Sequence, residues 1–284
     1  MYTQSITRTH RTAFILAIDQ SGSMAERLLF RGRETTKAAA VAEVTNRLLF
    51  ELIERARRSE QVRDYYDIAV LGYSGDGIVS MLDDPQTLVP VSRLAEMPVE
   101  YTETVVERRM PGGEPTLRKI TMPAWVAPKA AGATPMYETL LEIRDLARCW
   151  CDNPANAESF PPMVFNITDG ESSDCDEREL IELSEKIRSI ATKEGKVLLI
   201  NIHIATAADT RALIFPTEEE LGYGNRYARL LYDCSSPMPD QFTEAIRQVR
   251  GDHAEPPFRG MSYNTSISEL IAILNIGSIS IKLQ

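Results

Sequence analysis

One short stretch near the N-terminus carries oxygen-bearing side chains at a spacing that suits a metal ion. Asp19-Gln20-Ser21-Gly22-Ser23 places one carboxylate and two hydroxyls at alternate positions, directly after the apolar run Phe14 to Ile18. Hard oxygen ligands of this kind suit Mg²⁺ or Mn²⁺ and offer little to zinc. A short apolar run is typical of a buried strand. We therefore expect the three side chains on the loop that follows a strand.

Two distant segments carry side chains that could join them. Ala133-Thr134-Pro135 stands just before a predicted helix, and Ile167-Thr168-Asp169-Gly170 ends another apolar run. In an open parallel sheet, ligands bind beyond the carboxyl ends of the strands. Two carboxylates and three hydroxyls are therefore expected to meet at one end of one sheet, those of Asp19, Ser21, Ser23, Thr134 and Asp169.

A structural role for the same residues stays open. Serine and aspartate after a strand often cap a helix, and Asp169-Gly170 could form only a turn. The nearby acids Glu171, Asp174 and Asp176 are expected as solvated loop residues that could also repel acidic partners.

The elements that must position these residues alternate in type. Apolar runs predict buried strands, and apolar spacings of three and four predict amphipathic helices. The predicted strands are Phe14–Ile18, Tyr66–Tyr73, Met163–Thr168 and Val197–Ile204, and the predicted helices are Thr36–Arg57, Pro135–Trp150 and Asp176–Thr192. Strands that are apolar on both faces and alternate with helices indicate an α/β fold, with a doubly wound, mostly parallel sheet covered by helices on both faces.

Three regions depart from this alternation. Residues 81–130 hold seven prolines among β-prone pieces, and they predict a β-rich insertion with its own hairpin, since a structureless loop of that length is unusual. No strand is assigned within residues 207–260. Ser266 to Leu274 predicts a short helix, followed by a β-prone tail from Ser278 to Leu283. The expected organisation is a single domain over residues 1–284, with the insertion at 81–130 and a C-terminal extension at 255–284.

Composition excludes several classes of function. The net charge of −10 argues against a nucleic-acid partner, which normally meets a basic face. No stretch approaches the roughly 18 apolar residues that cross a bilayer, and a secretory signal is not expected at the N-terminus. The four cysteines do not resemble a disulfide framework, so a reducing, cytoplasmic location is expected.

The three oxygen-bearing segments together resemble a known motif. Asp19-x-Ser21-x-Ser23, Thr134 in Gly-Ala-Thr-Pro and Asp169 in Thr-Asp-Gly are similar to the metal-ion-dependent adhesion site of the von Willebrand factor A (vWA) family. All five residue types occur in the family's order. The first segment alone is a weak match, but the combination is specific. The resemblance covers about residues 13–250, and the insertion is its main departure.

The resemblance implies both a cofactor and a role. Ser21, Ser23 and Thr134 would ligate the cation through their hydroxyls, with Asp19 and Asp169 acting directly or through bound water. Mg²⁺ is the expected cofactor, with Mn²⁺ and Ca²⁺ as alternatives. The expected function is that of a metal-ion-dependent module that captures an aspartate or glutamate of a partner protein. Intracellular bacterial members of the tellurite-resistance type extend this expectation to a signalling or stress-response complex. Its expected partner is an AAA-type ATPase or a kinase and phosphatase pair.

Catalysis is not expected from the residues present. The chain has three histidines, of which His203 stands inside an apolar strand and is expected as a satisfied core residue. No Walker A sequence occurs, and Ser21 stands where phosphoaspartyl transferases place a second aspartate. No catalytic or organic-cofactor residues are therefore assigned. Two alternatives stay open: a metal-dependent phosphohydrolase that uses a cation-activated water, and a scaffold with a vestigial metal site.

Overall fold

In the computed structural model, eight strands form a central sheet in the order β13-β14-β12-β11-β1-β6-β7, with β8 paired to β6. The structure describes residues 2, 6, 7, 9–108, 116–205, 212–222 and 225–279. The strands of the sheet are β1 (Thr12–Asp19), β6 (Tyr66–Ser74), β7 (Gly77–Ser80), β8 (Val89–Pro90), β11 (Met163–Thr168), β12 (Leu198–Ile204), β13 (Leu213–Ile214) and β14 (Met261–Thr265).

The middle of this sheet is parallel. β1 pairs in parallel with β6 and β11, β12 continues this direction beside β11, and β14 continues it beside β12. β7, β8 and β13 are antiparallel additions. Every residue of β1 is buried, because successive side chains point to opposite faces and both faces are covered. Phe14 and Leu16 enter one core, and Ile15 and Ala17 enter the other.

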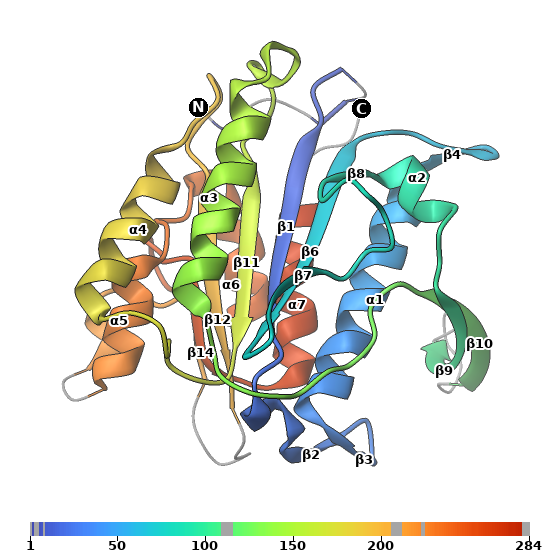
Figure 1. Cartoon of the computed structure of the whole chain (residues 1–284), viewed down its shortest axis with the longest axis horizontal. Helices are drawn as coiled ribbons and strands as arrows, with labels where there is room; N and C mark the ends of the chain where they lie inside the picture. The colour runs from blue at the N-terminus through green and yellow to red at the C-terminus, as the bar shows by residue number, and fades with distance from the viewer. Residues whose placement is uncertain are drawn as a thin grey trace.

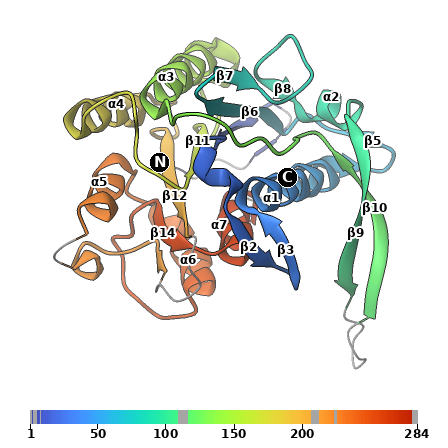
Figure 2. The same ribbon diagram turned by 60° about the horizontal axis from the view of Figure 1, so that its bottom comes forward.

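Helices cover both faces of the sheet. They are α1 (Lys37–Ala56), α2 (Val91–Ala95), α3 (Met136–Asp152), α4 (Glu177–Ser189), α5 (Arg226–Cys234), α6 (Thr243–Arg250) and α7 (Ile267–Ile279). Figure 2 shows α3 and α4 on one side of the sheet and α1, α6 and α7 on the other, and Figure 1 shows α3 and α4 lying along its strands. The prediction of a doubly wound, mostly parallel sheet is confirmed.

The helices begin where their capping residues stand. The Thr36 hydroxyl accepts the amide of Ala39 at the start of α1, and Asp176 and Glu179 form a reciprocal capping box at the start of α4. Pro135, predicted as the first residue of a helix, is instead the N-cap of α3. The predicted strand at residues 163–168 coincides with β11.

The insertion contains the expected hairpin. Within residues 81–130, β8 and α2 are followed by β9 (Glu100–Arg108) and β10 (Thr116–Ala124), which pair antiparallel. Residues 109–115 lie outside the described part of the chain. A smaller hairpin, β2 (Arg27–Phe30) with β3 (Arg33–Thr36), precedes α1. The two hairpins flank α1 on the side of the molecule that faces forward in Figure 2.

The C-terminal part of the chain belongs to the sheet. Residues 255–284, expected as an extension, instead supply β14, which lies between β12 and β13, and α7, which packs against α1. Ser262 and Asn264 interrupt the apolar pattern of β14, so no strand was expected there. Ser278 and Ile279, expected in a β-prone tail, end α7, and residues 280–284 lie outside the described residues.

The regular secondary structure described within residues 207–260 is mainly helical. It contributes β13, α5 and α6, whereas residues 206–211 and 223–224 are outside the described part. Within the described ranges, no helix is both long and apolar enough to cross a bilayer.

Candidate metal site

The site begins at the carboxyl end of β1. Asp19, the last residue of that strand, is fully buried. Its Oδ1 accepts the amide of Ser21 (2.8 Å) and its Oδ2 accepts the hydroxyl of Thr168 (2.7 Å). Burial raises the pKa of Asp19, because desolvation penalises the carboxylate, and the charge of Asp169 adds to this shift. A cation beside Asp19 would therefore stabilise its charged form.

Hydroxyls connect the first loop to the end of β11. The Ser21 and Ser23 Oγ atoms are 3.0 Å apart, and the Ser23 hydroxyl donates to Asp169 Oδ1 over 2.6 Å. Ser21 is buried whereas Ser23 is exposed. The structure thus brings Asp19, Ser21, Ser23 and Asp169 together at one end of the sheet, as the sequence predicted.

A buried lysine lies on the other side of Asp169. Lys37, the first residue of α1, is 2% exposed, and the Asp169 side chain is fully buried. The Lys37 Nζ donates to Asp169 Oδ2 (2.8 Å) and to Glu26 Oε2 (2.7 Å). The two oxygens of Asp169 therefore face different groups, a serine hydroxyl and an ammonium.

The loop that carries Thr134 is held against the first loop. The amide of Ala131 donates to the carbonyl of Gln20 (2.7 Å), and the amide of Gly22 donates to the carbonyl of Gly132 (3.0 Å). Gly132 has a φ of +76°, and a Cβ there would lie 2.8 Å from the Cα of Gly75 in the β6–β7 turn. Only glycine allows this close approach, so Gly132 lets the loop pack directly against the β6–β7 turn.

Thr134 itself is tied to the segment after Asp169. Its amide donates to the Ser173 hydroxyl, and its carbonyl accepts the amide of Ser173, both over 3.0 Å. Thr134 is 8% exposed, and its hydroxyl makes no hydrogen bond with any residue in the described ranges. All three predicted segments therefore meet at the same edge of the sheet.

The donor set fits a small hard cation. Mg²⁺ prefers octahedral coordination by oxygen at about 2.1 Å, which places neighbouring ligand oxygens about 3 Å apart. The 3.0 Å between the Ser21 and Ser23 Oγ atoms has this spacing, and the Thr134 hydroxyl is available as a further ligand. Across the described residues, no group of three or more histidine, cysteine, aspartate or glutamate side chains could hold a metal. The candidate site is of another kind, with two carboxylates and three hydroxyls.

Sequence reasoning missed Lys37. A signal was present, because Lys37 directly follows the capping residue Thr36, and a cation at the start of a helix opposes the helix dipole. Such a placement indicates a compensating carboxylate nearby. The contact with Asp169 spans 132 residues, however, and only the folded chain reveals it.

Two of the acids after β11 have structural roles. Asp174 accepts the amides of Tyr137 and Glu138 in the first turn of α3 (3.0 and 2.9 Å), and Asp176 caps α4. They were expected as solvated loop acids. They are exposed, but their hydrogen bonds to helix amides also hold the loops around Thr134 in place.

His203 lies close behind the site, as the satisfied residue that was expected. Its ring stacks on Tyr263 with centroids 4.6 Å apart, and its Nδ1 accepts the amide of Asn264 over 3.2 Å. Burial lowers the pKa of His203 to about 4, although the charge of Asp169 opposes the shift. The ring is therefore neutral at pH 7, with Nδ1 as the acceptor.

No family model matches the chain, and no curated protein matches it. A solved structure described as von Willebrand factor type A from Catenulispora acidiphila is similar, with 15% sequence identity and a TM-score of 0.39. The similarity covers 69% of this chain and 33% of that one, so this chain spans about a third of that protein's length.

Proposed function

We propose that this chain is a metal-ion-dependent protein-binding module. Ser21, Ser23 and Thr134 hold a divalent cation, Mg²⁺ in the first instance, together with Asp19 and Asp169. When bound, the cation supplies an electrophilic position that accepts a carboxylate oxygen of a partner protein. The observation that carries the proposal is the continuous contact from Ser21 through Ser23 to Asp169, which joins two loops 146 residues apart.

The charges around the site support a dication. Asp19, Asp169 and Glu26 provide three carboxylates and Lys37 provides one ammonium, which sum to −2. A divalent cation balances this charge. The ligands nearest to it are largely neutral hydroxyls, so the ion keeps the capacity to attract a further carboxylate.

The class of partner follows from the resemblance to the vWA family. We infer a cytoplasmic role, in a bacterial signalling or stress-response complex, beside an AAA-type ATPase or a kinase and phosphatase pair. In this role the chain binds and does not catalyse.

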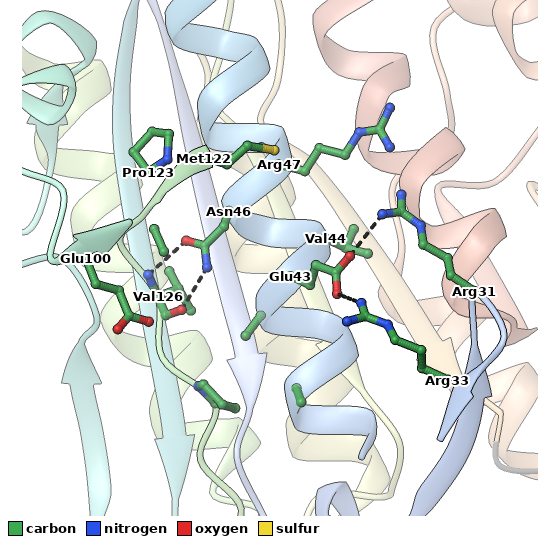
Figure 3. Close-up of a pocket in the computed structure, with 14 residues that line it drawn as sticks. Arg31, Arg33, Glu43, Val44, Asn46, Arg47, Glu100, Met122, Pro123 and Val126 are labelled. Atoms are coloured by element: carbon green, nitrogen blue, oxygen red, sulfur yellow. Dashed lines mark hydrogen bonds and ion pairs between the residues drawn. The ribbon is translucent and has the colours of Figure 1, made fainter. Parts of the chain in front are cut away.

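A cavity between α1 and the insertion supports a role for the insertion in reading the partner. A space of about 200 Å³ lies between α1 and the end of β10 with the residues that follow it (Figure 3), lined by Ala39, Ala42, Met122 and Val126 among others. We infer that an apolar side chain of the partner enters this space.

The wall of this cavity is fixed by one side chain. Asn46 of α1 donates to the carbonyl of Val126 (2.8 Å) and accepts the amide of the same residue (2.9 Å), as Figure 3 shows. It also accepts the amide of Trp125 (2.8 Å). On the opposite rim, Arg31 and Arg33 share the carboxylate of Glu43 (2.9 and 3.2 Å). Two cations on one carboxylate leave this rim basic, which favours an acidic partner segment.

Metal binding is tested with the ion alone. We expect Mg²⁺ or Mn²⁺ to raise the melting temperature of the native chain by mass action and to give saturable heat in calorimetry. The Ser21→Ala, Ser23→Ala double variant should lose both effects. Ser80→Ala in β7 is the control and should keep them, because its hydroxyl hydrogen-bonds only to the carbonyl of Leu82 among the described residues. Absence of any response in the native chain would contradict the proposed function. Turnover of a generic phosphoester that is lost in Asp19→Ala would favour the hydrolase instead.

Partner capture is tested with a shortened hairpin. Replacing residues 104–120 by Asn-Gly joins Glu103 to Thr121, which are paired across the hairpin, with a dipeptide suited to a two-residue turn. This leaves Asn46 and its contacts in place. The shortened chain should keep its Mg²⁺ response. It should lose Mg²⁺-dependent, EDTA-sensitive pull-down of partner. Unchanged pull-down would exclude the hairpin tip as a recognition surface.

A further inference from the structure

Two arginines from distant segments converge at the other end of the sheet. Arg188 of α4 donates from Nη1 to the carbonyl of Ser235 (2.9 Å), and Arg259, which precedes β14, donates from Nη1 to the same oxygen (3.4 Å). The Arg259 guanidinium lies over the ring of Tyr232, 4.3 Å from its centroid. Both guanidinium groups are half-buried and have fixed positions.

These arginines carry more charge than their surroundings compensate. In the part of the chain that the structure describes, neither forms an ion pair with a carboxylate. Burial, and then the charge of Arg259, lower the pKa of Arg188, while Cys234, Glu185 and Asp233 oppose the shift. Lys196 lies at the same cavity and adds a third cation.

Capping of a helix accounts for only part of this arrangement. Ser235 is the C-cap of α5, and a helix C-terminus carries roughly half a negative charge. That charge can hold one cation, but two full positive charges exceed it several-fold. Most N–H donors also remain available, since each guanidinium has five. Hydrogen bonds with described residues use two on Arg188, to Ser184 and Ser235, and one on Arg259.

The two guanidinium groups open onto a cavity of about 390 Å³. Lys196, Ser189 and Glu185 also line it. Guanidinium groups match the tetrahedral oxygens of phosphate with paired hydrogen bonds, and the space exceeds what one phosphate group needs. We propose that Arg188, Arg259 and Lys196 form a binding site for a phosphate dianion, either free or as a monoester.

This site is independent of the metal site. Its cavity reaches Leu198, the first residue of β12, whereas Asp19 is the last residue of β1. Because β12 and β1 run in the same direction, the two sites lie at opposite ends of the sheet. Failure of one proposal therefore leaves the other standing.

Phosphate binding is tested by calorimetry in EDTA, which removes divalent ions that bind phosphate themselves. Sodium phosphate and O-phosphoserine are titrated separately into the full chain at constant ionic strength. We expect one saturable site for either ligand, and tighter binding of O-phosphoserine would point to a phosphorylated protein as the source. Arg259→Gln should weaken binding at least about tenfold, because it removes a charge-assisted contact.

Two further variants keep the test decisive. Lys196→Gln should weaken binding up to about fivefold, because it removes an exposed charge. It removes no side-chain hydrogen bond that the structure describes, so it tests the site even if Arg259→Gln folds poorly. Arg178→Gln, also on α4 but 85% exposed and paired with Glu182, should bind like the native chain. No saturable binding, or equal affinity in the native chain, Arg259→Gln and Lys196→Gln, would overturn the proposal.

Discussion

At the scale of single residues, Lys37 is the main addition to the metal site that the sequence predicted. The buried ammonium of Lys37 lies beside Asp169 and already supplies positive charge close to the position proposed for the cation. The proposed ion would therefore share this carboxylate with the lysine, since Lys37 contacts Oδ2 and Ser23 contacts Oδ1. Lys37 keeps the Asp169 charge compensated whether or not an ion is bound.

Removal of this lysine should be costly in the absence of metal. Lys37→Met leaves the buried Asp169 carboxylate without its ion pair, and we expect it to lower the free energy of unfolding by about 3–5 kcal/mol in EDTA. Mg²⁺ should restore more stability to the variant than it adds to the native chain, because the ion then faces less repulsion. Urea unfolding with and without Mg²⁺ measures both effects.

The matched control for this change is an exposed pair. Arg57 and Glu54 form an ion pair with side chains 41% and 45% exposed, and Arg57→Met should cost no more than about 1 kcal/mol. Equal losses for Lys37→Met and Arg57→Met would show that the buried pair has no special weight.

His203 should make stability depend on pH below neutrality. Its pKa is about 4 in the folded chain and about 6.5 when unfolded. The unfolded chain therefore binds the proton more tightly, and stability is lost as the pH falls from about 6.5 to 4. The loss from this residue is about 2–3 kcal/mol.

His203→Phe keeps a ring on Tyr263 but cannot take up this proton. We expect the stability of the variant to fall less steeply than that of the native chain between pH 7 and pH 4, as measured by urea unfolding. At pH 8 both chains have a neutral ring, which gives the baseline for the comparison. Parallel curves over the whole range would contradict this role of His203.

At the scale of elements, a row of buried polar side chains ties strands to a helix. The Tyr73 hydroxyl donates to Asn166 Oδ1 (3.0 Å), Asn166 Nδ2 to Asn201 Oδ1 (3.0 Å), and Asn201 Nδ2 to Ser235 Oγ (2.9 Å). The row crosses from β6 to the end of α5. It passes over Ala17 of β1, which pairs with Asn166 in the sheet and whose short side chain leaves room for Tyr73.

Breaking this row should destabilise the fold more than the small change in side-chain volume suggests. Asn166→Leu keeps the size of the side chain but leaves the Asn201 amide oxygen without this partner and the Tyr73 hydroxyl with only its longer contact to the Ile167 carbonyl (3.5 Å) among the described residues. We expect a loss of about 2–4 kcal/mol in the free energy of unfolding, at about 1–3 kcal/mol per unpaired group.

A double-mutant cycle separates the row from simple packing. Tyr73→Phe removes one of the two groups that lose a hydrogen bond in Asn166→Leu, so the double variant should lose less than the sum of the single losses, by about 1 kcal/mol. Strictly additive losses would mean that the hydrogen bonds of the row contribute little.

At the scale of the whole molecule, the parallel sheet separates the two proposed sites. The seven residues of β12 extend over about 20 Å at about 3.3 Å per residue. At such a distance, substitutions without shared partners have additive effects. The metal site and the arginine pair should therefore behave as independent features.

This independence can be measured without any ligand. The losses of unfolding free energy in the Ser21→Ala, Ser23→Ala variant and in Arg259→Gln should add within about 0.5 kcal/mol when the changes are combined. A larger deviation, measured by urea unfolding in EDTA, would show that the two ends of the sheet are coupled.

The sheet core and the candidate ligands follow from the sequence alone. Phe14–Ile18 is apolar on both faces, which indicates a strand covered on both sides, and Met163–Thr168 is a mainly apolar, β-prone run. Asp19 and Asp169 directly follow such runs, so the direction of parallel strands places both at one edge. These conclusions depend only on local pattern and on a general rule of α/β sheets.

Tertiary structure alone decided what surrounds those ligands. Lys37 reaches Asp169 only because the β2–β3 hairpin returns the chain to the end of β11, and Gly132 can lie against Gly75 only once β6 and the later loop are packed together. Likewise, Arg188 and Arg259 meet at Ser235 from different elements. Such contacts depend on how side chains fill the space between elements that are far apart in the sequence. The periodicity of a sequence describes only local structure, so it cannot predict these contacts.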